Sequence, residues 1–202
     1  MNYKIEIIKK ENYNVSKWSG GRTTELYIYP KTAKYNNRDF KWRISTATVE
    51  VEESIFTRLE GFSRKLMVTE GKTVLAHEGM YNITLNPFEK DSFMGDWTTK
   101  SYGKASDFNL MTAKECIGAL DVLTIKAESE VSIEFQRTDT EISDFFYILG
   151  GNIEILMGNE KFYIEEKDLF CITYVSISEK IEFINKNYNE IKIIRAKVTD
   201  KF

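Results

Sequence analysis

Residues 40–56 read FKWRISTATVEVEESIF, and from Trp42 onward this segment alternates with a period of two. Successive side chains of a β-strand point to opposite faces, so the alternation predicts a strand that ends near Glu53. One face would carry Arg43, Ser45, Ala47, Val49 and Val51. We predict that this face points inward, because it ends in two valines and the opposite face carries a threonine and two glutamates at that end.

The other end of this predicted inward face is polar, since it begins with Arg43 and Ser45. A bare guanidinium is too costly to bury, so Arg43 needs a carboxylate, an anionic ligand or a water-filled cavity. The same pattern recurs in residues 63–71, SRKLMVTEG. One face of that strand would carry Arg64, Leu66 and Val68. Trp42 falls on the outer face, where we expect it to pack between strands.

The remainder of the chain also favours β-structure. Short runs rich in Ile, Val, Thr, Tyr and Phe alternate with Gly and Asn, whereas helical periodicity is scarce and the chain has only 2 prolines. This pattern is typical of an all-β sandwich or barrel. A second β-rich half begins near Lys114, so we expect two domains, residues 1–115 and residues 116–202.

Composition excludes several classes of function. The net charge is −3 and the basic residues are spread along the chain, so we expect no nucleic-acid binding. No apolar run is long enough to span a membrane, and the first residues lack the core of a signal peptide. Cys116 and Cys171 form no CxxC motif, which favours structural thiols in a reducing, cytoplasmic compartment.

A catalytic metal or nucleophile is poorly supported. His77 is the single histidine of the chain, whereas a transition-metal site in a β-barrel typically needs two or three histidines and a carboxylate. We therefore expect no metal and no cofactor, and we expect His77 at the surface or in a turn. The chain has no GxSxG motif, and its glycine pairs are followed by no GK[ST] phosphate-loop signature.

Five polar residues form the remaining constellation: Arg43, Ser45, Arg64, Asp107 and Asn109. Asp107 and Asn109 share a face of the predicted strand in KASDFNLMTAK. If this face meets the two arginines, two cations lie beside one acid and a net positive charge remains. Because a guanidinium suits bidentate recognition of a carboxylate, we predict a pocket for a small anionic ligand. Further candidates for the same pocket are Thr23, Thr24 and Glu25. Which of them reach the pocket depends on the phase of their strand. The alternative is purely structural: Arg43 or Arg64 pairs with Asp107, and nothing binds.

Four segments together resemble one family. They are WSGGRTTELYIYP from Trp18, the long segment from Phe40 to Val68, LNPFEKDSFMGDW from Leu85, and SDFNLMTAK from Ser106. This combination resembles the HutD/Ves family. Many relatives carry an Asn before the two glycines of the first motif, whereas this chain has Ser19.

The resemblance implies a bicupin, with two cupin-like, jelly-roll, antiparallel barrels in one small cytoplasmic chain. It also implies a non-catalytic protein that binds a small metabolite and takes part in histidine utilisation. Two other classes stay open on the residues: a metal-free cupin isomerase or epimerase with Tyr and Asp or Glu as acid and base, and a structural interaction protein without a ligand. Both a monomer and a homodimer fit the sequence.

Overall fold

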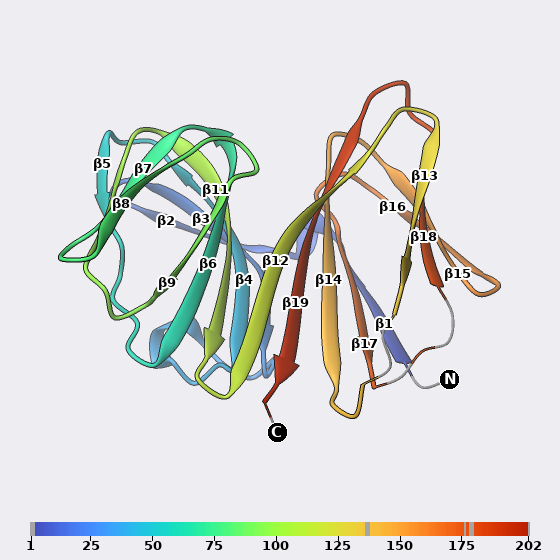
Figure 1. Cartoon of the computed structure of the whole chain (residues 1–202), viewed down its shortest axis with the longest axis horizontal. Coiled ribbons are helices and arrows are strands. Elements are labelled where there is room, and N and C mark those ends of the chain that lie inside the picture. Colours follow the sequence, from blue (N-terminus) through green and yellow to red (C-terminus); the bar gives the residue numbers. More distant parts are fainter. Residues whose placement is uncertain (1–2, 136–137, 176, 178–179, 202) are drawn as a thin grey trace. The chain divides into compact units, whose positions relative to one another are not determined.

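The structure, a computed structural model, describes residues 3–135, 138–175, 177 and 180–201. In these ranges the regular elements are nineteen strands and two short 3-10 turns, without an α-helix (Figure 1). The all-β prediction is therefore confirmed. No helix in the described part of the chain is long and apolar enough to cross a membrane.

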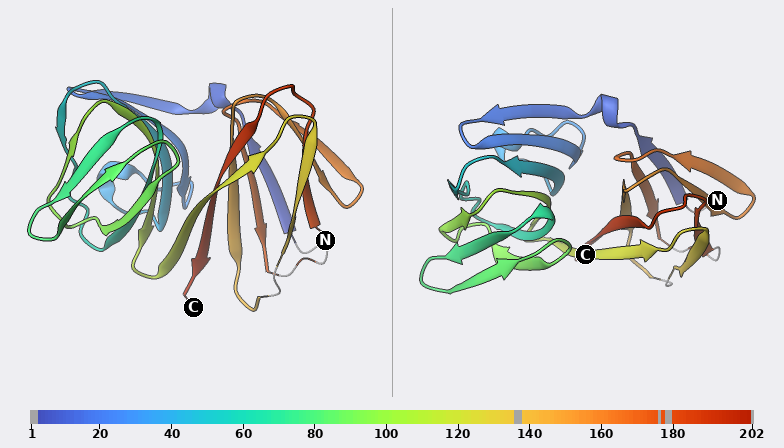
Figure 2. Two further views of the ribbon diagram at one scale, coloured as in Figure 1. Left: turned by 45° about the horizontal axis from the view of Figure 1, so that its top comes forward. Right: turned by 90° about the horizontal axis from the view of Figure 1, so that it is seen from above.

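The chain folds into two compact units, and Figure 2 shows the strands of each from two further directions. The N-terminal unit is Tyr13–Gly118, and the C-terminal unit combines the residues up to Asn12 with those from Ala119 onward. The predicted ranges were 1–115 and 116–202. The structure differs at the start of the chain, because the first strand belongs to the C-terminal unit.

The N-terminal unit is built from two sheets. One has six strands, in the hydrogen-bonded order β2 (Asn14–Trp18), β3 (Gly21–Tyr29), β4 (Trp42–Val49), β11 (Ala105–Ala113), β6 (Phe62–Gly71) and β9 (Lys90–Met94). The other has four, in the order β5 (Glu53–Ile55), β10 (Thr99–Tyr102), β7 (Thr73–His77) and β8 (Tyr81–Leu85). Leu66 of β6, Leu75 of β7 and Leu85 of β8 belong to one buried cluster, so the apolar core lies between the two sheets.

β4 is a central strand of the six-stranded sheet, hydrogen-bonded to β3 on one side and to β11 on the other, both antiparallel. It ends at Val49, and after a bend the chain enters β5 in the other sheet. The predicted strand ran on to Glu53 with Val51 on its inward face. That extension was wrong, because the segment crosses between sheets here and Val51 lies half-buried in the bend.

The C-terminal unit is also built from two sheets. One has five strands, in the order β1 (Tyr3–Ile8), β17 (Leu169–Tyr174), β14 (Ile142–Leu149), β19 (Ile191–Asp200) and β12 (Cys116–Ile125). The other has four, in the order β13 (Ser129–Glu134), β18 (Lys180–Asn185), β15 (Ile153–Met157) and β16 (Glu160–Ile164). Phe146, Phe170 and Phe183 come from both sheets and share one buried cluster, which forms the core of this unit.

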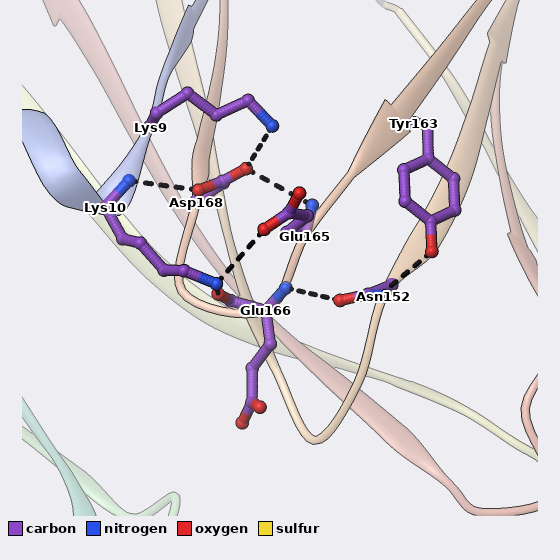
Figure 3. Close-up of polar contacts among 7 residues, drawn as sticks. All are labelled: Lys9, Lys10, Asn152, Tyr163, Glu165, Glu166 and Asp168. Carbon is purple, nitrogen blue, oxygen red and sulfur yellow. Dashed lines mark hydrogen bonds and ion pairs between the residues drawn. The ribbon is translucent and has the colours of Figure 1, made fainter.

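The first strand is held in the C-terminal unit by backbone and side-chain contacts. β1 pairs antiparallel with β17 along its whole length, and the 3-10 turn η1 (Lys10–Asn12) follows it. The buried Asp168 carboxylate accepts hydrogen bonds from Lys9 Nζ at 2.8 Å, from the Lys10 backbone N at 3.0 Å and from the Glu165 backbone N at 3.2 Å (Figure 3). The assignment of this strand to an N-terminal domain was therefore wrong, because β1 supplies an edge of the sheet that β14 and β17 build.

The two sheets of each unit stay separate in the hydrogen bonding of the described strands. In the N-terminal unit β2 is an edge of the six-stranded sheet and β5 is an edge of the four-stranded sheet. All five residues of β2 are exposed, whereas β4 is mostly buried. The unit is thus packed at its centre and open beside β2 and β5.

Candidate functional site

A cavity of about 350 Å³ lies within the N-terminal unit. Its lining comes from β2, β3, β4, β6 and β11 of one sheet, from β5 and the residues after it, and from the 3-10 turn η2 (Tyr35–Asn37). The volume is in the range of roughly 300–1,000 Å³ that is usual for small-molecule sites. Five of the eight predicted site residues are both buried and part of this lining: Arg43, Ser45, Arg64, Asp107 and Asn109.

Strand register explains why these five residues meet. Directly opposed residues of antiparallel strands share a face, so the register of β4, β11 and β6 defines inward rows. The three rows are Arg43, Met111 and Arg64; Ser45, Asn109 and Leu66; and Ala47, Asp107 and Val68. The period-two phase read from the sequence therefore places the polar residues together on one sheet face.

Arg43 is already compensated by neighbouring side chains. Its Nε donates to Glu25 Oε2 at 2.7 Å, and one terminal nitrogen donates to Ser45 Oγ at 3.1 Å. The Tyr35 ring lies 4.4 Å from the guanidinium carbon. Of the three possibilities that the sequence left open for Arg43, the structure shows a carboxylate partner, Glu25.

Arg64 is compensated far less. Its guanidinium carbon lies 4.8 Å from the Phe56 ring centre and 5.3 Å from that of Phe93. Within the described residues its buried Nε has no hydrogen-bond partner. Burial lowers the pKa of Arg64 to about 10, although the nearby Tyr35 and Asp107 partly oppose that shift. Arg64 therefore contributes to the cavity lining and carries a buried Nε donor that is unpartnered in this part of the structure.

Asp107 and Asn109 add two unused acceptors. In the described part of the chain, Oδ1 of Asp107 and Oδ1 of Asn109 have no hydrogen-bond donor although both atoms are buried. Burial raises the pKa of Asp107 to about 7, and the charge of Arg64 opposes this rise without cancelling it. Since buried polar groups are nearly always hydrogen-bonded, three unsatisfied atoms around one cavity indicate a site for water or a ligand.

The three further candidates on β3 have separate roles. Thr23 stands opposite Ala47 and lines the cavity. Thr24 pairs with Thr46 and so belongs to the other face of the sheet, which leaves it outside the cavity lining. Glu25 holds Arg43, and a bulge in the pairing of β3 with β4 follows directly after it.

Several lining residues escaped the sequence reasoning. Trp18 was not among the candidate site residues, yet it lines the cavity with 38% of its surface exposed. Tyr35 and Phe56 also line the cavity, although neither was among the candidate site residues. By contrast, Trp42 stacks on Tyr29 with ring centres 4.1 Å apart and stays out of the cavity, as the strand phase predicted.

The single histidine is buried rather than exposed, so its predicted surface position was wrong. His77 lies 2.8 Å from Thr99 Oγ1 through Nδ1 and 2.8 Å from Asp91 Oδ2 through Nε2. The Tyr81 hydroxyl donates to the other Asp91 oxygen at 2.9 Å. Both ring nitrogens have partners, and His77 is outside the cavity lining.

Within the described ranges, no group of three or more His, Cys, Asp or Glu side chains could hold a metal ion. The expectation of a protein without a bound transition metal stays a prediction, which elemental analysis of the purified protein can check.

Each unit pairs two antiparallel sheets, and the N-terminal unit holds a cavity with a polar floor. This architecture is cupin-like. A variant of Bacillus subtilis oxalate decarboxylase shares the fold with a TM-score of 0.66 at 5% identity, over 96% of this chain and 76% of that chain. A conserved protein of unknown function from Pseudomonas aeruginosa matches with a TM-score of 0.80 at 19% identity, over 96% and 98% of the two chains. At such identities the likeness shows the fold.

The family follows from the sequence match. A model of the HutD family matches residues 10–186, and the chain belongs to that family. The structure of HutD from Pseudomonas fluorescens in a formate condition is similar, with a TM-score of 0.70 at 20% identity over 96% of this chain and 98% of that chain.

Proposed function

We propose that this protein binds a small anionic metabolite, a carboxylate, in the cavity of its N-terminal unit and does not transform it. The observation that carries the proposal is Arg64, a buried guanidinium whose Nε has no partner among the described residues. Leaving such a charge unsatisfied is costly, and a carboxylate offers two oxygens in the geometry that a guanidinium recognises.

The other floor residues suit the same ligand. Arg43 is neutralised by Glu25, so the cation available to an anion is mainly Arg64. Ser45 and Asn109 offer neutral hydrogen-bonding groups beside it. Asp107 would repel an anion when ionised, but its raised pKa of about 7 allows it to be neutral and to donate a hydrogen bond.

Three finer assignments belong to this proposal. We propose that both units are cupin-type barrels, since each pairs two sheets around one core. We propose a part in regulating histidine utilisation, which the family resemblance implies. We propose a cytoplasmic location, which the two buried thiols Cys116 and Cys171 favour.

A thermal-shift screen with small carboxylates tests the proposal, with urocanate, N-formylglutamate and glutamate among them. A ligand that binds only the native state adds roughly 2.7 kcal/mol of stability at a hundredfold excess over its Kd. We expect at least one carboxylate to raise the Tm of wild type, and Arg64→Met to lose that response. Arg22→Met is the control, because Arg22 is an exposed arginine of the same unit that pairs with Glu50. A wild type that responds to no carboxylate, or an Arg64→Met variant that responds fully, would contradict the proposal.

A second candidate is a metal-free enzyme that moves a proton, and Asp107 is the observation that favours it. A buried carboxyl with a pKa near 7, with an unused oxygen at a cavity, resembles a general acid or base. Exchange of ligand C–H hydrogens in heavy water, followed by NMR, separates the two functions. Exchange that requires wild-type Asp107 and is lost in Asp107→Asn would favour the enzyme, whereas binding without exchange favours the binding protein.

A further inference from the structure

The cavity has a polar floor, and its mouth combines apolar side chains with the exposed polar residues Ser16, Asn36 and Thr57. The floor is formed by the buried polar residues of β4, β6 and β11 described above. The mouth lies beside the edge strands β2 and β5, where Trp18 is 38% exposed and Ile55 is 66% exposed. Phe56 and Val49 add further apolar surface to the lining. A ligand that fills this space meets a charged group at the floor, and at the mouth it meets the large apolar side chains of Trp18 and Ile55 beside smaller polar ones.

The position of the Trp18 ring is built into the chain. A Cβ atom placed on Gly20 would lie 2.1 Å from Trp18 Cζ3, so the indole packs directly on the backbone of Gly20. Trp18 ends β2 opposite Gly21, at the turn into β3. Only a residue without a side chain leaves room for the ring here, which explains the first glycine of the WSGG motif. The ring is thereby held beside the cavity while remaining exposed.

The size of the cavity points the same way. A carboxylate group alone would occupy a small part of the cavity of about 350 Å³ and would leave Trp18 and Ile55 exposed to solvent. Covering these side chains removes apolar surface from water, which is the main source of affinity in such sites.

We infer that the ligand is an amphipathic carboxylate, with its anionic group at Arg64 and an apolar body that covers Trp18 and Ile55 at the mouth. This inference rests on the proposed function and specifies its substrate class. It distinguishes a carboxylate with a hydrocarbon or aromatic body from one that carries a second charged group at its far end.

Titration calorimetry with acetate, butanoate, pentanoate and 3-phenylpropanoate tests the inference on the full chain. Each buried methylene should raise the affinity roughly fourfold. Pentanedioate has the length of pentanoate with a second carboxylate, and we expect it to bind at least tenfold more weakly. We also expect 3-phenylpropanoate to change the tryptophan fluorescence, because Trp18 lines the cavity whereas Trp42 and Trp97 do not.

Two variants complete the experiment. In Trp18→Ala the affinity for 3-phenylpropanoate should fall about tenfold while that for acetate stays unchanged. Met94→Ala is the matched control, an exposed apolar residue of the same unit outside the cavity lining, and should bind both as wild type does. Equal affinity along the series, or tighter binding of pentanedioate than of pentanoate, would overturn the inference and leave the proposed function intact. Absence of binding by every carboxylate would overturn both.

Discussion

The buried Arg64 and the half-buried Arg195 differ in how their charge is balanced. Arg195 of the C-terminal unit donates from Nε to Asp144 Oδ1 at 2.9 Å and from a terminal nitrogen to Oδ2 at 2.5 Å. Arg64 of the N-terminal unit has no such carboxylate partner, and Asp107 near it keeps an oxygen unused in the described part of the chain. Arg195 is balanced within the fold, whereas we propose that Arg64 is balanced by an anion in the cavity.

This contrast predicts opposite effects of the same substitution. Arg195→Met leaves the buried Asp144 uncompensated and should lower the free energy of unfolding by about 3–5 kcal/mol. Arg64→Met removes an unsatisfied buried charge and should stay within about 1 kcal/mol of wild type, or exceed it. Urea denaturation of the two variants provides the comparison. If Arg64→Met loses as much stability as Arg195→Met, then Arg64 is a structural residue.

The raised pKa of Asp107 makes stability depend on pH. Its folded pKa of about 7 lies above the ordinary 3.8, because burial disfavours the ionised form. The stability that this raised pKa contributes is fully present below about pH 4 and is lost as the pH rises from there through about 7. Asp107→Asn removes this dependence, so relative to wild type it should gain stability between pH 4 and 7, on the order of a few kcal/mol.

Thermal unfolding of wild type and Asp107→Asn over this pH range gives the test. The Tm difference in favour of the variant should grow with pH and level off above about pH 7. Glu60→Gln is the control, because Glu60 is an exposed carboxylate of the same unit outside the cavity lining. A difference that shrinks with rising pH would mean that Asp107 is ionised and stabilised in the folded state.

At the scale of the elements, alternation predicted the site strands well. The period-two phase of residues 43–49 and 64–68 put the arginines on the inward face, where the register of β4, β6 and β11 brings them together. The same rule applied to β7 would have placed His77 inward with Thr73 and Leu75, as the burial pattern of that strand shows. The surface prediction for His77 did not take this phase into account.

Other features could not be deduced from local pattern. The partner of Arg43 is Glu25, whose position depends on the pairing of β3 with β4 and on the bulge that follows it. The bend after Val49 reflects the need to reach the second sheet, which the alternation of the sequence does not encode. Such long-range pairings determine which side chains can satisfy one another, so the sequence predicted the polar cluster but not its unsatisfied atoms.

The β2–β3 hairpin offers a prediction at this scale. A Cβ on Gly21 would lie 2.0 Å from the Thr48 carbonyl oxygen of β4. Gly21→Ala should therefore push β3 away from β4 and lower the free energy of unfolding by roughly 1–3 kcal/mol. The urea midpoint measures this change. Lys17→Ala on exposed β2 is the control and should stay within about 0.5 kcal/mol, and an equal loss in both variants would contradict the close approach.

At the scale of the whole molecule, the position of a strand along the chain does not always indicate the unit to which it belongs. β1 comes first in the sequence but completes a sheet of the C-terminal unit by pairing with β17. The Asp168 carboxylate then fixes the turn that follows β1. A boundary read from composition alone misses this, because β1 by itself has the pattern of any short strand.

Asp168→Ala should loosen β1 without affecting the cavity. The substitution leaves the backbone N–H groups of Lys10 and Glu165 without their acceptor, at a cost of about 1–3 kcal/mol. Hydrogen exchange should accelerate in β1 and β17 and stay unchanged in β4 and β11. Glu165→Ala, which removes only the exposed ion pair with Lys10, should have little effect. Equal acceleration in β4 and β11 would contradict the division into these two units.

The central claim is that an anion binds to Arg64, whose Nε has no partner among the described residues. The Nε–H group can be observed directly. In a ¹⁵N-labelled protein, the arginine Nε–H resonances are followed by NMR during titration with 3-phenylpropanoate and with acetate, and Arg64→Met assigns the signal. We predict that the Arg64 proton moves downfield in a saturable way and exchanges more slowly with water, while Arg195, already bound to Asp144, stays in place. An Arg64 resonance that does not move at any carboxylate concentration, or that moves only together with Arg195, would contradict the account.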